Sequence, residues 1–311
     1  MQVQSILQAE KLIKFSKEKY ILDNVSFEVY PGEVLGLIGP AGSGKSSVVK
    51  ALMGLTKMQD GAVLVDGINI KDNRVDCLKM IGSVIEKPSF YSSMSGYSNL
   101  KYFASLMQDV SKERVDEVLI QVGIDQATAK KLINSYNPEE LQKLALAGAL
   151  LSSPKILILD DITKGMDFRA ITEFKKLLRR IVASSTTGIL ITTRSIEEAE
   201  TMCDRIAIMH EGKILKISSI EQMDVTTVGQ DMVTKYAISV ANPFVAGQTI
   251  SKYFKTVKYE TVGSKLVINT TRSQIQEVYK AFLDKDVVII SIEQTSHSSD
   301  DLYNEIVKKY S

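Results

Sequence analysis

The chain has 311 residues, more than one domain usually holds, which predicts either two domains or one large domain with an appendix. Hydrophobic residues at 44% and charged residues at 24% are ordinary for a globular protein and exclude a disordered or fibrous chain. The 38 basic and 37 acidic side chains leave a net charge of +1, so nothing predicts a nucleic-acid partner or an anionic membrane surface. Any anion binding must therefore be local.

The cysteines and the N-terminus indicate the compartment. Cys77 and Cys203 lie far apart without metal-ligand spacing, which fits a reducing cytoplasm. Residues 1–20 carry charges throughout, and no window reaches the ~18 to 20 apolar residues of a spanning helix. We expect a protein that is neither secreted nor membrane-spanning.

Residues 1–220 alternate short apolar runs with amphipathic stretches. The runs typical of strands are Val34–Ile38, Val63–Val65, Ile156–Leu159, Ile189–Thr192 and Ile206–Met209. This alternation predicts an α/β fold with a largely parallel sheet. Ile214–Ile217 follows the last run after a turn and predicts a hairpin at the end of the sheet. Between about residues 88 and 153, the amphipathic runs Tyr97–Met107 and Lys112–Val122 predict a helical subdomain.

The alternation of apolar and amphipathic runs breaks off beyond Ile220, and a new set of elements begins near residue 236. This predicts a linker at residues 221–235 and a second domain at residues 236–311. The expected elements of this domain are, in order, strand Tyr236–Val240, helix Phe244–Phe254, strands Thr256–Thr261 and Lys265–Thr270, helix Ser273–Leu283, strand Val287–Glu293 and helix Ser299–Lys309. The first six follow the order β-α-β-β-α-β of the split βαβ sandwich, a small α+β fold. No catalytic constellation lies among them, so we expect a regulatory or interaction domain.

The strand Val34–Ile38 leads directly into a sequence of the form G-x-x-x-x-G-K-[ST], made by Gly39, Pro40, Ala41, Gly42, Ser43, Gly44, Lys45 and Ser46. Glycines let the backbone wrap phosphates, Lys45 neutralises the outer phosphates and the Ser46 hydroxyl binds Mg²⁺. The expected contacts continue to Ser47, where a helix-like stretch begins. The succession of strand, loop and helix favours a phosphate site over a glycine-rich turn that binds nothing.

Two carboxylates follow the apolar run Ile156–Leu159, and ligands of open α/β sheets collect at this end of the strands. Asp160 is expected to hold Mg²⁺ through water, with Asp161 beside it. The alternative is that the two aspartates only start a turn or cap a helix.

With these motifs, residues 1 to about 217 resemble the ATPase subunits of ABC transporters, and the whole chain looks most like the bacterial drug, bacitracin and lantibiotic exporter type. The resemblance implies a P-loop NTPase fold of the ABC type, with ATP and Mg²⁺ as ligands. It also implies a cytoplasmic position on the inner face of the cell membrane. The implied partners are a multi-spanning membrane permease and a second ABC ATPase subunit, either a paralogue or a second copy of this chain.

Further positions follow from the resemblance. Phe15 falls where the family has an adenine-stacking aromatic residue, although an aromatic that only packs in the core is an equal alternative. Gln142, 18 residues before Asp160, begins the family's Gln-Arg pair after its signature. Gly165–Asp167 corresponds to the loop that crosses the dimer interface. Glu86 replaces the usual glutamine of the loop that senses the γ-phosphate and contacts the membrane subunit, and it is unfavourable beside bare phosphate.

The catalytic positions implied by the resemblance are Glu86, Asp161 and Arg194, and they depart from the family. Asp161 replaces a catalytic glutamate and is one methylene shorter, with roughly 1 to 1.5 Å less reach, which weakens a general base. Arg194 replaces the switch histidine, and a guanidinium can hold a phosphate but cannot shuttle a proton at neutral pH. A plain solvated charge is the alternative for Arg194.

The largest departure is the signature, where Tyr136, Asn137, Pro138, Glu139 and Glu140 replace Leu-Ser-Gly-Gly-Gln. In the family this helix start donates to the γ-phosphate bound on the partner subunit. Here Pro138 lacks an N–H. The two glutamates place carboxylates in the positive field of the helix start, which would otherwise attract an anion. Asn137 as N-cap with Glu140 three residues later predicts a capping box instead.

The expected function is therefore an ATP-binding subunit of an export-type transporter with weak hydrolysis of its own, most naturally one half of a heterodimer. One alternative is an ATP-gated regulatory or scaffold module with negligible turnover. Another is a P-loop phosphotransferase outside the ABC family, against which the 18-residue spacing of Gln142 and Asp160 counts.

Overall fold

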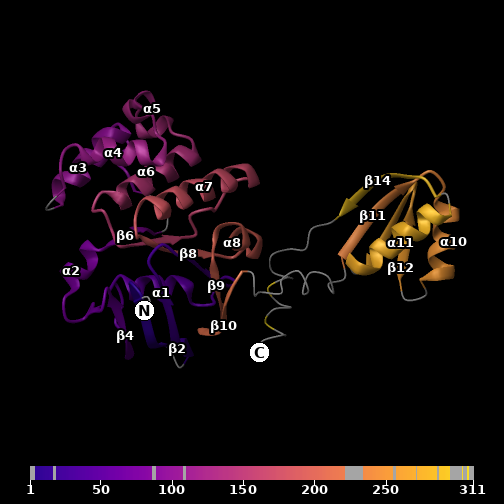
Figure 1. Cartoon of the computed structure of the whole chain (residues 1–311), viewed down its shortest axis with the longest axis horizontal. Helices are drawn as coiled ribbons and strands as arrows, with labels where there is room; N and C mark the ends of the chain where they lie inside the picture. Colours follow the sequence, from indigo (N-terminus) through magenta and orange to yellow (C-terminus); the bar gives the residue numbers. More distant parts are fainter. Residues whose placement is uncertain are drawn as a thin grey trace. The chain divides into compact units, whose positions relative to one another are not determined.

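The computed structural model describes residues 4–16, 19–85, 89–107, 110–220, 234–254, 257–270, 272–285 and 287–294, together with Tyr303 and Val307. The chain divides into two compact units between Ile220 and Glu221 (Figure 1). Each unit has its own sheet structure and its own hydrophobic core.

A six-stranded sheet with the order β10-β9-β3-β8-β7-β6 forms the centre of the N-terminal unit. Its strands are β3 (Val34–Ile38), β6 (Ile81–Val84), β7 (Ile156–Asp160), β8 (Gly188–Thr193), β9 (Arg205–His210) and β10 (Lys213–Ser219). All neighbours pair in parallel except β9 and β10, which form the expected hairpin at the end of the sheet. Every residue of β3, β7 and β8 is buried, as parallel strands covered on both faces require.

A separate antiparallel sheet has the order β2-β1-β4-β5, with β1 (Leu7–Ser16), β2 (Lys19–Val29), β4 (Asp60–Val65) and β5 (Ile68–Asn69). The assignment of Val63–Val65 to the parallel sheet was therefore wrong, because these residues lie in β4 and pair antiparallel with β1. A three-residue apolar run carries no information about the direction of its neighbour. The pairing is set by β1, which lies more than 40 positions away in the chain.

The helices of this unit are α1 (Lys45–Leu52), α2 (Arg74–Lys79), α3 (Gly96–Leu106), α4 (Arg114–Val122), α5 (Gln126–Lys130), α6 (Pro138–Leu150), α7 (Phe168–Ser184) and α8 (Ile196–Met202), with a short 3-10 helix at Ile133–Ser135. Figure 1 shows α3 to α6 gathered at the end of the unit opposite β2 and β4. This group is the predicted helical subdomain. None of the helices in the described ranges is long and apolar enough to cross a membrane.

The C-terminal unit contains β11 (Thr234–Val240), α10 (Pro243–Tyr253), β12 (Lys258–Val262), β13 (Lys265–Thr270), α11 (Arg272–Asp284) and β14 (Ile289–Gln294). The chain order is the expected β-α-β-β-α-β, and the antiparallel sheet has the order β12-β13-β11-β14. Ile238, Leu266 and Phe282 are fully buried at the centre of its core. Of the predicted helix Ser299–Lys309, Tyr303 and Val307 are helical and the other positions lie outside the described residues, as do residues 221–233.

Candidate functional site

One cavity of about 940 Å³ in the N-terminal unit brings most of the predicted site residues together. Its walls come from the loop after β3 and the start of α1, from the carboxyl ends of β7 and β8, and from the start of α6. The predicted site residues that line it are Ala41, Gly42, Gly44, Lys45, Ser46, Ser47, Asp160, Asp161 and Arg194. Segments far apart in the sequence thus meet where ligands of α/β sheets bind.

The loop after β3 needs glycine at two positions. Gly44 has φ +111° and caps α1, and a Cβ there would lie 2.6 Å from the Met209 Cε and 2.9 Å from the Ile21 carbonyl oxygen. A Cβ on Gly39 would lie 2.3 Å from the Met209 carbonyl oxygen. The backbone therefore passes too close to β9 and β2 for any side chain. Helix α1 starts without a side-chain cap and without an acidic residue in its first turn.

Lys45 lies at the base of the cavity. Its Nζ donates to the carbonyl oxygens of Gly39 at 2.5 Å and Pro40 at 3.0 Å. Burial and the nearby charge of Arg194 lower the pKa of Lys45 to about 8, although Asp161 and Asp160 act in the opposite direction. An ammonium group at this position gains an anionic partner if a phosphate enters the cavity.

The two aspartates differ in backbone geometry. Asp160 is buried at the end of β7 and accepts a hydrogen bond from the Thr192 hydroxyl. Asp161 has φ +54°, a left-handed conformation that aspartate tolerates better than most residues. Its N–H donates to both the carbonyl and the hydroxyl oxygen of Thr192 at 3.1 Å. Thr192 on β8 therefore fixes both aspartates at the cavity wall.

The cavity wall fits a hydrated Mg²⁺ and a nucleotide's phosphates. The Ser46 hydroxyl and the Asp160 carboxylate line the same cavity, and they are the hard oxygen ligands that Mg²⁺ prefers. Within the described chain, the Ser43 Oγ and the Gln142 Oε1 are buried without a hydrogen-bond partner. Buried polar atoms of this kind are normally satisfied, so a bound polar ligand or water suits both places.

Four predicted site residues stand apart from the lining. Gly39 and Pro40 act through their carbonyls on Lys45, and Ser43 is buried within the loop. Phe15, on β1, is 42% exposed and packs edge-on against Tyr20 with ring centroids 5.1 Å apart. It is not among the described residues that line the cavity, and its exposure does not fit the core-packing alternative, so its contact with adenine stays a prediction. Glu86 lies outside the described residues.

The lining also includes Pro138 and Gln142, which the resemblance placed at and after the signature, and four residues that received no role from the sequence: Ile21, Leu141, Lys164 and Thr192. Thr192 was the one with a usable signal, because it lies at the carboxyl end of a buried strand that is parallel to β7. Ile21, Leu141 and Lys164 depend on how β2, α6 and the loop after β7 fold around the cavity, which no local pattern encodes.

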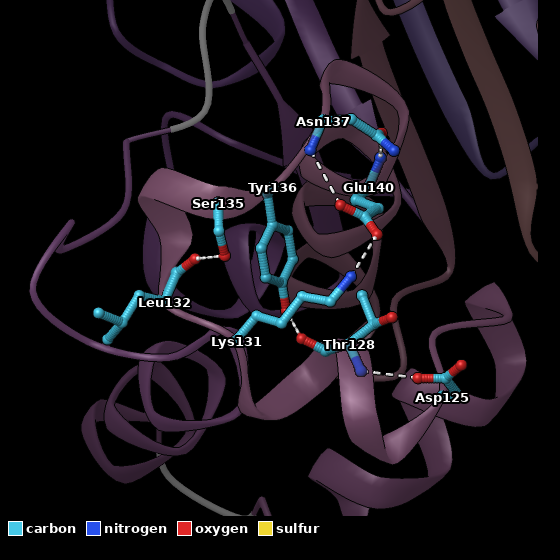
Figure 2. A network of polar contacts seen from close by, with 8 residues as sticks. All are labelled: Asp125, Thr128, Lys131, Leu132, Ser135, Tyr136, Asn137 and Glu140. Atoms are coloured by element: carbon cyan, nitrogen blue, oxygen red, sulfur yellow. Dashed lines mark hydrogen bonds and ion pairs between the residues drawn. The ribbon is translucent and has the colours of Figure 1, made fainter.

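The signature helix α6 begins with the predicted capping box, which Figure 2 shows in full. The Asn137 side chain accepts from the Glu140 N–H at 2.8 Å, and the Glu140 carboxylate accepts from the Asn137 N–H at 2.9 Å. Lys131 pairs with Glu140 at 3.2 Å, and Lys143 pairs with Glu139 at 2.7 Å. Each carboxylate at this helix start is therefore already paired within the chain.

Tyr136 fastens this helix start to the rest of the helical subdomain. Its hydroxyl donates to the Thr128 carbonyl on α5 at 2.7 Å (Figure 2). Burial raises the pKa of the Tyr136 hydroxyl to about 12. A Cβ on Gly96, at the start of α3, would lie 2.1 Å from the same oxygen. Tyr136 thus holds α6 against both α3 and α5.

The parallel sheet, the phosphate loop and the inserted helical subdomain together define a P-loop nucleotide-binding protein of the ATP-binding-cassette class. The profile of the ABC transporter family matches residues 22–164. The ABC transporter ATP-binding protein YhcH of Bacillus subtilis is 30% identical over 304 residues, covering 98% of this chain and 96% of that protein. The chain belongs to the ATP-binding proteins of ABC transporters, a family whose general activity is ATP hydrolysis.

Two relatives named for transport also match. The bacitracin transport ATP-binding protein BcrA of Enterococcus faecalis is 26% identical over 307 residues, covering 99% of this chain and 98% of that protein. The lantibiotic transport ATP-binding protein SrtF of Streptococcus pyogenes is 33% identical over 210 residues, covering 68% and 89%. These matches confirm the resemblance drawn from the motifs.

A solved structure confirms the fold class. The structure of cbiO1 from Clostridium perfringens, part of the ABC transporter complex cbiONQ, superposes with a TM-score of 0.65 at 25% identity. It covers 72% of this chain and 94% of the cbiO1 chain.

Proposed function

We propose that this chain is the ATP-binding subunit of an export-type ABC transporter and that it binds Mg-ATP in the 940 Å³ cavity. The observation that carries the proposal is the meeting of Lys45, Ser46 and Asp160 in that one cavity. The transport names of BcrA and SrtF support export of an antibiotic peptide or drug as the process that the ATP serves.

Each residue has a role in this proposal. The N–H groups at the start of α1 and the Lys45 ammonium bind the phosphates, while Ser46 and Asp160 hold Mg²⁺. When bound, the ion draws negative charge from the β- and γ-phosphates. Arg194, which lines the same cavity near Lys45, adds a second cation for the terminal phosphate.

Hydrolysis by the chain alone is proposed to be slow. Asp161 is the only carboxylate beside Asp160 among the described lining residues, and its short side chain is a weak general base for water. Arg194 cannot give up and recover a proton at neutral pH. At the altered signature, Pro138 offers no N–H, and Glu139 and Glu140 repel phosphate.

These departures favour a pairing with a second ATPase subunit whose signature is intact. ATP bound on this chain would then meet donors from the partner, while ATP on the partner would meet the capped start of α6. A paralogue fits this arrangement better than a second copy, because two copies would place the altered signature at both sites.

A membrane permease is the third component, which would hold the chain at the cytoplasmic face of the membrane. An exposed aromatic patch supports its docking on the helical subdomain: Tyr91 and Tyr102 are 51% and 40% exposed and meet edge-on at 5.3 Å. Buried Asn99 fixes the backbone of Tyr91 through hydrogen bonds of 2.8 and 3.1 Å. A rigid aromatic surface of this kind suits a short amphipathic helix of a membrane subunit.

Steady-state ATP turnover tests the proposal. The chain alone should hydrolyse ATP at least ~10²-fold more slowly than typical enzymes, since loss of one general base commonly removes that much. Turnover should rise when the chain is reconstituted with a membrane permease and a second ATPase subunit whose signature is intact. Several turnovers per second by the chain alone would contradict the weak-site proposal. Nucleotide binding with no rise in any assembly would favour the ATP-gated regulator.

A further inference from the structure

The Glu198 carboxylate, on α8, joins two loops that border the cavity. Its Oε2 accepts from the Thr163 hydroxyl at 2.5 Å and from the Thr193 hydroxyl at 2.7 Å. Both threonines are 1% exposed. Glu198 is itself absent from the described cavity lining.

Each threonine is adjacent to residues that do line the cavity. Thr163 precedes Lys164 and follows Asp161 by two positions, and the Lys164 N–H donates to the Asp161 carbonyl at 3.1 Å. Thr193 precedes Arg194, and its own carbonyl accepts from the Gly39 N–H at 3.4 Å. One carboxylate oxygen therefore ties the Asp161–Lys164 loop to the Arg194 loop and, through Thr193, to the start of the phosphate loop.

The helix start holds Glu198 in place for this task. Ser195 caps α8 by accepting from the Glu198 N–H at 3.1 Å, and the Ser195 N–H donates to the Thr193 hydroxyl at 3.1 Å. These two hydrogen bonds hold the start of α8, and with it Glu198, against the end of β8. Two buried hydroxyls that donate to one ionised oxygen make charge-assisted bonds, which are stronger than bonds between neutral groups.

We propose that Glu198 is a positioning residue that sets the spacing between the Asp161–Lys164 loop and Arg194, and so gives the cavity its preference for ATP over ADP. The inference rests on the proposed function, because it assumes that these two loops flank the terminal phosphate. In the proposed function, Lys45 and the α1 start bind the β-phosphate, and Glu198 reaches the phosphate loop only indirectly, through the 3.4 Å bond from the Gly39 N–H to the Thr193 carbonyl. Loss of the bridge that Glu198 makes between Thr163 and Thr193 should therefore weaken ATP binding more than ADP binding.

The test compares Mg-ATP and Mg-ADP affinities by calorimetry in the full chain, with thermal unfolding measured in parallel. Glu198→Ala should lower the ratio of ATP to ADP affinity about tenfold, in the range that residues coupling two elements commonly show. Glu198→Gln keeps an oxygen that accepts from both hydroxyls and should restore most of the ratio. Glu200→Ala is the matched control, because it removes an acid of the same helix that takes no part in the hydrogen bonds of Ser195, Thr193 and Thr163, and it should leave the ratio unchanged.

A second pair of variants covers the case in which Glu198→Ala fails to fold. Thr163→Val removes one donor at nearly constant shape and should lower the ratio, whereas Thr163→Ser should keep it. An unchanged ratio in Glu198→Ala or Thr163→Val, even with a lower melting temperature, would mean that the bridge is only structural and would overturn the inference. Wild-type protein that binds neither nucleotide would overturn the proposed function and this inference together.

Discussion

Two helix starts in the same unit have opposite chemistry. Helix α1 begins at Gly44 without a side-chain cap or an acidic residue, and the nearby Ser43 hydroxyl is buried without a partner. Helix α6 begins at Asn137 with a complete capping box, and Glu139 and Glu140 stand in its first turn. Both starts contribute residues to one cavity.

The difference teaches what makes a helix start able to bind an anion. Every helix leaves N–H groups unpaired at its start and carries a partial positive charge there. At α1 no side chain caps these groups, and Lys45 adds a positive charge. At α6 the N–H groups of Asn137 and Glu140 donate to each other's side chains, and the carboxylates neutralise the positive field of the helix start. Local side chains, not the helix, decide between binding a phosphate and stabilising the fold.

The largest expected effect comes from converting the α6 start into one that resembles α1. Changing Asn137, Pro138, Glu139 and Glu140 to Ser, Gly, Gly and Gln removes two carboxylates. A carboxylate ~5 Å from a γ-phosphate costs about 3 kcal/mol at an effective dielectric of ~20, more than one neutral hydrogen bond returns. ATP-dependent association in sedimentation, alone or with the partner ATPase, should therefore strengthen, by up to about 100-fold for a carboxylate that lies this close to the phosphate and less for one screened by solvent.

Asn137→Ser alone is the control for this exchange, because serine keeps an N-cap and leaves Pro138 and both carboxylates in place. It should not change association. If the fourfold variant behaves like this control with and without the partner, the α6 start does not face nucleotide in the assembly.

The converse change disables the α1 start. Lys45→Ala should weaken Mg-ATP binding by roughly 1.5 to 3 kcal/mol, about 10- to 150-fold, because it removes a charge-assisted phosphate contact. Calorimetry measures the loss directly. Lys50→Ala removes a lysine from the last turn of the same helix and should leave affinity unchanged. Equal affinities for wild type and Lys45→Ala would place the nucleotide elsewhere.

The Lys45 ammonium also predicts a pH dependence. Its pKa in the folded, nucleotide-free protein is lowered from 10.5 to about 8, so its charged fraction falls as pH rises through 8. Between pH 7.5 and 9 this fraction drops from about three quarters to about a tenth, and ATP affinity should fall nearly tenfold. Binding at pH 9 should take up a proton, which calorimetry in buffers of different ionisation enthalpy detects. Lys45→Arg keeps its charge throughout and should give a flatter profile.

The α1 side of the cavity could be predicted from the sequence because its chemistry is contiguous. Residues Gly39 to Ser46 follow a strand directly, and Asp160 ends a second buried run. The capping box of α6 was equally local, since Asn137 and Glu140 lie three positions apart. Short-range patterns of this kind fix backbone geometry without help from distant residues.

The rest of the site depends on long-range pairing, which these patterns do not contain. Thr192 fixes the two aspartates only because β8 pairs with β7, and Glu198 reaches Thr163 across 35 positions of the chain. The surroundings of Phe15 depend on pairing in the same way, since the pairing of β1 with β2 sets its side chain against Tyr20. Of the antiparallel sheet that contains both strands, the predicted elements included only part of β4, at Val63–Val65.

The smallest expected effect is a difference in thermal stability, without nucleotide, between a variant at the α6 start and a variant at the α1 start. Asn137→Ala removes a cap that satisfies the Glu140 N–H, and lost caps typically cost about 1 kcal/mol, or about 2 to 4 °C in melting temperature for a unit of this size. Ser43→Ala removes a buried hydroxyl that has no partner, so it should leave the melting temperature unchanged or raise it slightly. Thermal unfolding of both variants measures the contrast. Equal losses would mean that Ser43 also stabilises its own helix start, and the distinction between an open α1 and a closed α6 would then not hold.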